Sequence, residues 1–277
     1  MKKLFCILMT SFAMVCNAAD ITFMFTDPPG GGAERVVNAM LPTLERSGLT
    51  VEKQFFKSCV DAANEMRPDK TTKILILSPG AVNWSNTSEG GKCAPISRWA
   101  YTPKLYTTLV SGSLFVCTVP NYQPGKKIRI GYTVSVEQTN LVNRYIANQT
   151  GDYVGLPYPG IGPLRTAITA GDVDMFFATS LANEMIAKGG TCIAATAKDN
   201  TKKLPFVGNM PEYITAISAV VVNDVPVKVN TSIVSALQSP EFNSEIAKME
   251  YKHKGIGANV PVSEQLKSLI YLETSFK

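Results

Sequence analysis

The stretch Ile21–Leu44, ITFMFTDPPGGGAERVVNAMLPTL, decides the fold. Its opening residues, 21–25, form an apolar run that predicts a short buried strand. The run meets a proline- and glycine-rich turn at 27–32, which no regular element can contain. Apolar residues from 36 to 44 then recur at helical spacing, and Gly48 ends the predicted helix. A strand, a glycine turn and a helix in this order predict an α/β fold.

The same alternation of strands and helices continues along the chain. Further strands are predicted at 51–56, 74–77, 114–119, 128–131, 153–156, 174–177, 192–196 and 219–222. Further helices are predicted at 61–66, 141–146, 164–168, 181–188, 233–237, 240–249 and 266–270. Strands that alternate with helices form parallel β-α-β units, so we expect two mixed, mainly parallel sheets that are covered by helices.

The order of these elements predicts two lobes. The strand at 219–222 and the helices after it resume the first sheet, so the chain visits a second lobe and returns. We expect lobe 1 at 19–121 plus 216–277 and lobe 2 at 122–215. The hinge between them is expected near 119–124 and 213–217.

The N-terminus has the features of an export signal. Lys2 and Lys3 precede the apolar run 4–15, and small residues after it predict cleavage behind residue 18. The run is shorter than the ~20 residues that a membrane-spanning helix needs. Lipid attachment at Cys16 is the alternative, although the valine before it is a poor fit to that modification. With residues 1–18 as a signal peptide, we expect the protein in the periplasm.

Composition narrows the class of partner. Hydrophobic residues make up 45% of the chain and charged residues 18%, which favours a packed core over disorder. The net charge of +5 comes from scattered residues, with no basic cluster longer than a pair, so nucleic acid is not expected as a partner. A mildly positive protein favours an anionic ligand. We expect a monomer without a cofactor or a metal.

Cysteine usage fits an exported protein. Outside the signal region lie Cys59, Cys93, Cys117 and Cys192, and no two of them have the close spacing of a compact metal site. An oxidising compartment allows several pairings. We favour Cys59 with Cys93, on predicted loops, and Cys117 with Cys192, inside predicted strands. Free, buried cysteines are the alternative.

The glycine turn carries the clearest chemistry. Gly30, Gly31 and Gly32 follow a strand and precede a helix, so their backbone N–H groups can approach a ligand without interference from a Cβ atom. The helix N-terminus adds partial positive charge, and its natural guest is a carboxylate or a phosphate. A turn without a ligand is the alternative, because short glycine runs are weakly specific.

Several motifs together resemble one family. The stretch Ile21–Leu44 resembles the N-terminus of the substrate-binding proteins of tripartite tricarboxylate transporters, the Bug family. Further similar segments are Val154–Gly160, Ala170–Phe176, Lys203–Pro205 with Met210–Glu212, and the predicted helices that begin at Pro240–Phe242 and Val262–Gln265. The resemblance covers nearly the whole chain after the signal.

The resemblance implies a type II-like Venus flytrap that closes on a small carboxylate, with a membrane permease of a tripartite transporter as its partner. It also implies which residues bind the ligand. In lobe 1 these are Pro29, Gly30, Gly31, Gly32, Ala33, Glu34, Ser78, Pro79, Gly80 and Ala81. In lobe 2 they are Tyr132, Thr133, Ser135, Tyr158, Gly160, Gly162, Thr179 and Ser180. These residues follow predicted strand ends, where open α/β sheets bind ligands.

Three positions depart from the family pattern. Glu34 stands where the family commonly has aspartate, Pro159 where it has lysine, and Asn140 where histidine is frequent. Pro159 removes one possible salt bridge to an anion. An amide, an amino acid or an aromatic acid therefore stays open as the ligand beside dicarboxylates and tricarboxylates.

The sequence offers no set of residues that would be suitable for catalysis. His253 is the only histidine, lies between two lysines, and is expected on the solvated surface. Without a histidine near a serine or cysteine, a nucleophilic triad lacks its base. Asp172 and Asp174 are expected to cap and face solvent rather than bind a metal. We expect no enzyme; an enzyme or a sensor-coupled binding protein on this scaffold is the alternative.

Overall fold

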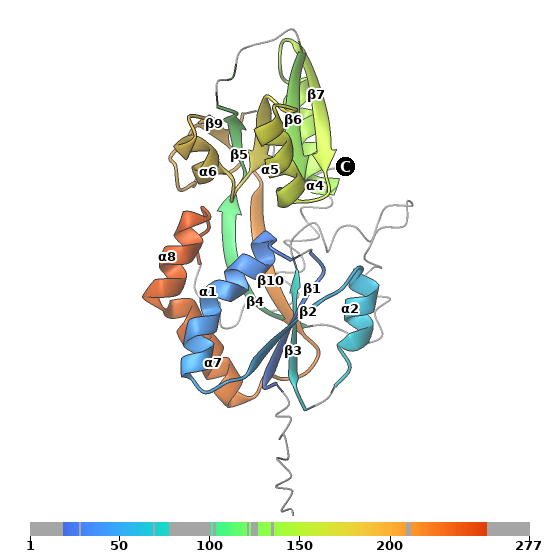
Figure 1. The fold of residues 1–277 in the computed structure, drawn as a ribbon, viewed down its shortest axis with the longest axis vertical. Coiled ribbons are helices and arrows are strands. Elements are labelled where there is room, and N and C mark those ends of the chain that lie inside the picture. Colours follow the sequence, from blue (N-terminus) through green and yellow to red (C-terminus); the bar gives the residue numbers. More distant parts are fainter. Residues whose placement is uncertain are drawn as a thin grey trace, which may run out of the picture.

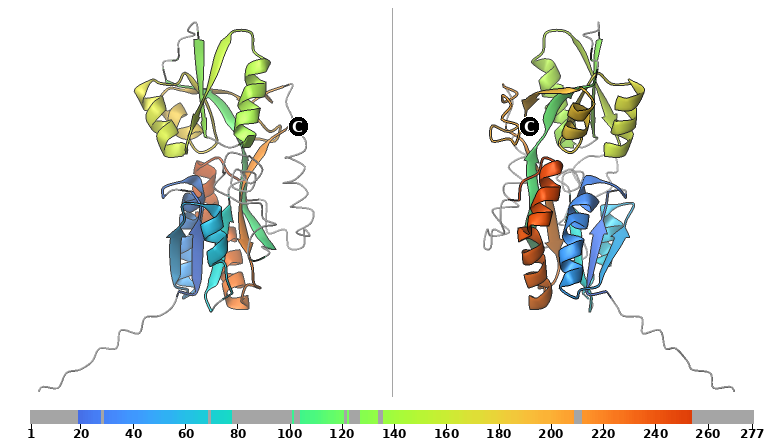
Figure 2. Two further views of the ribbon diagram at one scale, coloured as in Figure 1. Left: turned by 90° about the vertical axis from the view of Figure 1, so that its right-hand side faces the viewer. Right: turned by 60° about the vertical axis from the view of Figure 1, so that its left-hand side comes forward.

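The computed structural model describes residues 19–27, 29–68, 70–77, 101, 104–120, 122, 127–133, 136–208 and 212–253. Two five-stranded sheets with their helices form two groups, one above the other in Figures 1 and 2. The predicted signal peptide, the loop 83–95 and the predicted helix 266–270 lie outside the described residues. Within the described part of the chain, no helix has the length and apolar character that crossing a membrane requires.

The first lobe is built on a sheet with the strand order β2-β1-β3-β10-β4. Its strands are β1 (Ile21–Phe25), β2 (Val51–Phe55), β3 (Thr72–Leu77), β4 (Lys104–Ser113) and β10 (Ile214–Val221). β1 pairs in parallel with both β2 and β3, whereas β10 runs antiparallel to both of its neighbours. Its helices are α1 (Gly32–Arg46), α2 (Cys59–Glu65), α7 (Val227–Gln238) and α8 (Pro240–Lys248).

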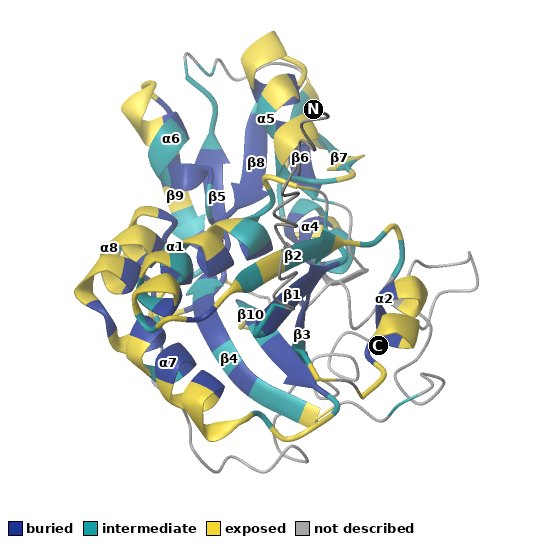
Figure 3. Ribbon diagram, turned by 60° about the horizontal axis from the view of Figure 1, so that its bottom comes forward, coloured by how far each residue is buried: buried dark blue, intermediate teal, exposed yellow. Residues whose placement is uncertain are grey.

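Alternating side chains of the first sheet reach two separate cores. Phe23 and Phe25 of β1 pack with buried residues of α1, α7 and α8 on one face. Met24 points to the other face and packs with Ala62 of α2. β1 is buried at every position (Figure 3), and this two-sided burial explains why four of its five residues, all except Thr22, are apolar. The predicted helix after the glycine turn is confirmed as α1, which continues past Pro42 to Arg46.

The second lobe repeats this plan with the strand order β7-β6-β8-β5-β9. Its strands are β5 (Phe115–Thr118), β6 (Lys127–Thr133), β7 (Asp152–Tyr158), β8 (Met175–Ala178) and β9 (Thr191–Ala195). Helices α5 (Ile161–Ala170) and α6 (Ala182–Ala187) pack on one face, and α4 (Val136–Ala147) packs on the other. A Cβ atom on Gly131 of β6 would lie 2.6 Å from Leu164 of α5, so glycine allows this close packing. The predicted two-lobed α/β fold class is confirmed.

The chain crosses between the sheets at two neighbouring points. Leu114 alone separates β4 from β5, and the return runs from β9 to β10 through Tyr213. Thr196, which is fully buried, joins both crossings. Its hydroxyl accepts the Leu114 N–H at 3.0 Å and donates to the Tyr213 carbonyl at 2.8 Å. The Thr196 side chain thus links the two crossings, in addition to the backbone bonds of Thr196 with Leu114 and Tyr213.

The crossings differ in position from the sequence expectation. Residues 115–118 pair within the second sheet, whereas lobe 1 was expected to reach 121. β10 already begins at Ile214, ahead of the expected return at 216. The expectation followed the turn residues at 120–125, but the chain passes straight from β4 into β5 without a turn signal. Turn chemistry marks the end of β5 rather than the crossing.

Candidate functional site

The glycine turn lies where the sequence analysis expects it, between the end of β1 and the start of α1. Pro29 and Gly30 are exposed, Gly31 and Gly32 are partly exposed, and Ala33 is buried against the core. Gly30 has φ +81°, a left-handed conformation that a residue with a Cβ atom rarely adopts. The turn thus needs glycine for its backbone path as well as for access.

Glu34 holds this turn in place. Its Oε2 accepts the Gly30 backbone N–H at 2.7 Å, and its Oε1 pairs with Lys53 Nζ of β2. The Gly30 N–H first, and Lys53 second, lower the pKa of the Glu34 carboxyl below its ordinary value. The carboxylate is therefore engaged with the protein, and its negative charge is balanced within the first lobe.

Two helices, α1 and α5, begin after a glycine N-cap, which has no side chain to cap their first turn. Gly31 is the N-cap of α1 and Gly160 the N-cap of α5. Unpaired N–H groups and the helix dipole make each of these ends attractive to an anion. α1 follows β1 of the first sheet, and α5 follows β7 of the second. Each lobe therefore supplies one such helix end.

Most of the lobe 2 candidates lie at the carboxyl ends of neighbouring strands. Tyr132 and Thr133 end β6, Tyr158 ends β7, and Thr179 with Ser180 directly follows β8. Thr133 donates its hydroxyl to Gln138 Oε1 at 2.9 Å. Gly160 is partly exposed, and Gly162 in the first turn of α5 is exposed.

Two of these candidates are buried in the protein itself. Tyr132 is 4% exposed and packs in the core beneath α4. Thr179 is 3% exposed and donates its hydroxyl to the Ser113 carbonyl at 2.8 Å. Their side chains serve packing and inter-lobe contact in this structure. Ser78, Pro79, Gly80, Ala81 and Ser135 lie outside the described residues.

Tyr251, which the sequence analysis did not single out, links candidates from both lobes. It follows α8, and its hydroxyl lies 3.9 Å from the position of a Cβ atom on Gly32. Its ring and the Thr179 side chain both lie beside Gly112 of β4. Burial raises the pKa of Tyr251 to about 12, so the hydroxyl is neutral at physiological pH. In the sequence Tyr251 stands between Glu250 and Lys252, and this charged context gives no indication that the side chain is buried.

Two expectations about charged residues have different outcomes. His253 is not a solvated surface residue: its Nδ1 lies 2.8 Å from the Leu109 carbonyl oxygen, and its ring packs edge-on against Phe242. Asp174 accepts hydrogen bonds from the Arg129 backbone and guanidinium, which lower the pKa of its carboxyl. The described residues contain no metal-type cluster of histidine, cysteine and carboxylate side chains.

The predicted Cys117–Cys192 disulfide is confirmed. The two cysteines face each other on the antiparallel strands β5 and β9. Such a bond fits an oxidising compartment. Cys59 is the first residue of α2 rather than part of a loop, and Cys93 lies outside the described residues, so their pairing stays a prediction.

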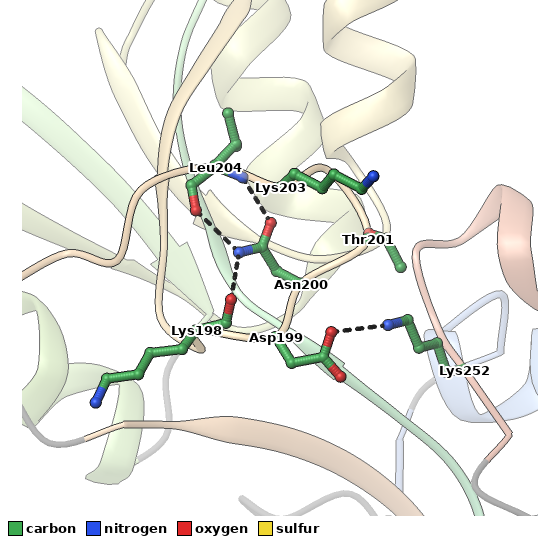
Figure 4. Close-up of a pocket in the computed structure, with 7 residues that line it drawn as sticks. All are labelled: Lys198, Asp199, Asn200, Thr201, Lys203, Leu204 and Lys252. Atoms are coloured by element: carbon green, nitrogen blue, oxygen red, sulfur yellow. Dashed lines mark hydrogen bonds and ion pairs between the residues drawn. The ribbon is translucent and has the colours of Figure 1, made fainter.

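A surface hollow of about 470 Å³ lies beside the segment that joins β9 to β10 (Figure 4). Asn200 shapes this segment, because its side chain bonds to the carbonyls of Lys198 and Leu204 and to the Leu204 N–H. The hollow is lined by Lys198, Asp199, Asn200, Thr201, Lys203, Leu204 and Lys252. None of these residues is among the predicted ligand contacts.

Comparison with known proteins identifies the fold. No family model matches the sequence, and neither does any curated protein sequence. MatC from Rhodopseudomonas palustris with bound malate is similar at a TM-score of 0.70 and 14% identity, over 93% of this chain and 98% of that one. The periplasmic binding protein BugD is similar at 0.70 and 11%, over 92% and 94%. An R. palustris protein with adipate is similar at 0.66 and 14%, over 94% and 95%.

These likenesses show that the chain has the fold of two-lobed periplasmic binding proteins. The resemblance to the Bug family that the sequence motifs indicate is confirmed at the level of this fold, which BugD shares.

Proposed function

We propose that the protein is a periplasmic solute-binding protein that captures a small carboxylate between its lobes without chemical conversion. The ligand is a dicarboxylate, a tricarboxylate or a related organic acid, delivered to the permease of a tripartite transporter. The observation that carries this proposal is the pair of glycine-capped helix ends, one on α1 and one on α5.

Hydrogen-bond energetics support a carboxylate. A hydrogen bond to a charged acceptor contributes about 1.5–3 kcal/mol, and several N–H groups at two helix ends can share the oxygens of one acid. Because Glu34 already occupies the Gly30 N–H, the ligand would use the following amides of α1. Two of the similar structures hold malate and adipate, which are carboxylates of this kind.

The binding residues we propose are those of the glycine turn and of the strand ends in the second lobe. Ser78–Ala81 and Ser135 belong to this proposal, since they follow β3 and β6 in sequence. We add Tyr251 to this set, because it lies beside Gly32 of the first lobe and Thr179 of the second. Lobe closure about the crossings at Leu114 and Tyr213 would bring the two helix ends onto one ligand.

Export supports the same assignment. Residues 1–18 read as a signal peptide, and the Cys117–Cys192 disulfide suits the periplasm. We propose cleavage behind residue 18 and a monomeric mature protein.

A thermal-shift panel tests the proposal. Malate, adipate, citrate and neutral amides are compared, and at least one acid is expected to raise the melting temperature while mass spectrometry recovers it unchanged. Gly31→Leu should abolish the shift, because leucine fills the approach to α1. Gly31 has φ −68°, which any residue adopts, so this change does not strain the backbone.

Ala147→Leu, at the exposed end of α4, is the matched control and should keep the shift. Unchanged binding in Gly31→Leu would place the site elsewhere. A shift with neutral amides alone would rule out a carboxylate, and a converted product would show an enzyme.

A further inference from the structure

The end of α8 and the segment that follows it contact the second lobe at several residues. Glu250 Oε1 pairs with Lys202 Nζ at 2.9 Å. The Glu250 carboxylate is also hydrogen-bonded to the Thr201 hydroxyl. At the end of α8, the Lys248 carbonyl accepts the Asn183 Nδ2–H at 3.1 Å. These contacts all join the end of α8, in the first lobe, to the second lobe.

A further contact lies at the surface hollow in Figure 4. There, the Asp199 carboxylate and Lys252 Nζ lie 3.2 Å apart and point toward each other from two separate segments. Both side chains are exposed, so this pair is screened by solvent. The Glu250–Lys202 pair is different, since its side chains are only 7% and 17% exposed.

Glu250 is anchored in the first lobe. Its neighbour Tyr251 packs in the core formed by α1, α7 and α8. The next residue, Lys252, exchanges backbone hydrogen bonds of 2.9 and 2.8 Å with Ser111 of β4. The backbone of Glu250 therefore moves with the first sheet.

Lys202 is anchored in the second lobe. Its Nζ donates to Asn183 Oδ1 of α6 at 2.6 Å and lies 5.7 Å from the centre of the Phe115 ring. Leu204, two residues further on, packs against the core of α5 and α6. The ion pair thus joins two bodies that are also connected by the crossing strands and by weaker surface contacts.

The backbone of Glu250 shows that this position is specialised. α8 ends in a Schellman motif, in which the Tyr251 N–H bonds to the Ile246 carbonyl at 2.9 Å and the Glu250 N–H to that of Ala247 at 3.0 Å. Glu250 is the residue after the C-cap, Met249, and has φ +61°, a conformation in which glycine is strongly preferred. Glutamate accepts this strained conformation, and its carboxylate is thereby directed into the second lobe.

From this geometry we infer that Glu250 and Lys202 are positioning residues that fix the relative orientation of the lobes. A buried ion pair contributes little net stability, but it disfavours every arrangement in which either charge is buried alone. The pair therefore selects one lobe orientation and sets how much of the protein is ready for ligand. The statement about readiness for ligand rests on the proposed function.

The deciding measurement is the distance between the lobes in the ligand-free protein. Spin labels carried by a non-natural amino acid are placed at the exposed residues Asn64 of α2 and Asn143 of α4. Double electron–electron resonance should give one narrow distribution for the parent protein. The double variant Lys202→Met with Glu250→Gln leaves no buried charge alone, and we expect a broadened distribution with a second population.

The matched control is the exposed pair Glu245–Lys248, which lies within α8 and joins no lobes. Glu245→Gln with Lys248→Met should leave the distribution unchanged. If the Lys202 and Glu250 variant fails to fold, Asn183→Ala decides, because it removes bonds to both Lys202 and Lys248. An unchanged distribution in the folded variant overturns the inference. No ligand is needed, so this outcome is separate from that of the thermal-shift panel.

Discussion

The Glu34 carboxylate accepts the Gly30 backbone N–H at 2.7 Å, so the first turn of α1 stabilises the turn that precedes it. An anionic side chain in front of a proposed anion site would oppose binding if it were free. Here its charge is balanced by Lys53, whose ammonium group pairs with the other carboxylate oxygen. The glycine turn is thereby ordered before any ligand arrives, which reduces the entropy lost on binding.

Glu34→Ala should weaken binding of the responsive acid about tenfold, because ordering the turn would then cost about 1.4 kcal/mol of binding free energy. Glu34→Gln keeps an oxygen for the Gly30 N–H and should lie between parent and alanine variant. Isothermal titration calorimetry measures both. Glu52→Ala, an exposed carboxylate of β2, is the control. Equal affinity in Glu34→Ala and the parent would contradict a role in ordering the turn.

Arg129 and Asp174 give a pH-dependent contribution to stability. The pKa of Asp174 is lowered in the folded state, first by the Arg129 side chain. Its contribution is therefore complete above the unfolded pKa of about 3.9 and is lost as the pH falls through the folded pKa. Asp174→Asn should reduce the free energy of unfolding by roughly 1 kcal/mol at pH 7, since Arg129 is partly exposed. Urea unfolding of both proteins should converge at acidic pH; a constant difference would refute the assignment.

The Cys117–Cys192 disulfide closes a loop that contains most of the second lobe. Replacing both cysteines by alanine should lower the free energy of unfolding by about 2–5 kcal/mol, largely because the unfolded chain gains freedom. Urea unfolding measures the change. A reducing agent should destabilise the parent more than the double variant, in which only the predicted Cys59–Cys93 bond would remain to be reduced. Equal sensitivity of both proteins would show that another bond is responsible.

Tyr251 predicts a response at high pH. Its pKa of about 12 exceeds the value of about 10 for an unfolded tyrosine. The neutral hydroxyl thus stabilises the fold fully below pH 10, and this contribution is lost as the pH rises toward 12. Tyr251→Phe should cost about 1 kcal/mol at pH 8, because it removes the polar interactions of the buried hydroxyl. Between pH 9 and 11.5 the variant should lose less stability than the parent; parallel losses would exclude Tyr251 as the titrating group.

Thr196 should be sensitive to a change that preserves its shape. Thr196→Val removes the hydroxyl and leaves the Leu114 N–H and the Tyr213 carbonyl without this partner. Because the site is fully buried, we expect a loss of about 1–3 kcal/mol in the free energy of unfolding. Thr166→Val, on the exposed face of α5, is the control and should differ little from the parent. A small effect at Thr196 would mean that the crossings do not depend on it.

Local sequence pattern predicts the first lobe core well, because β1 and α1 are determined by neighbouring residues. The alternation of apolar runs and glycine turns also predicts the repeated strand-helix units of the second lobe. β4 was not predicted. Its sequence KLYTTLVSGS contains buried Thr107, Ser111 and Ser113, which resemble loop residues until their partners on β10 are known.

The candidate site is predictable only in part. The glycine turn is visible because its function depends on consecutive residues. Glu34 with Lys53, Tyr251 with Thr179, and Glu250 with Lys202 are pairs that folding brings together from distant positions. In a single sequence such pairs leave no periodic signal. Glu250 is harder still, because glycine is the expected residue at its backbone conformation.

The place of β10 between β3 and β4 has a consequence for biogenesis. A chain that is exported from its N-terminus, as we propose, presents every strand of the second sheet before Ile214 emerges. Until then β3 and β4 have no common neighbour, and each exposes backbone groups that other chains can pair with. Translation products that stop short of β10 should therefore be substrates for periplasmic chaperones and proteases, whereas the inserted lobe can already complete its own sheet.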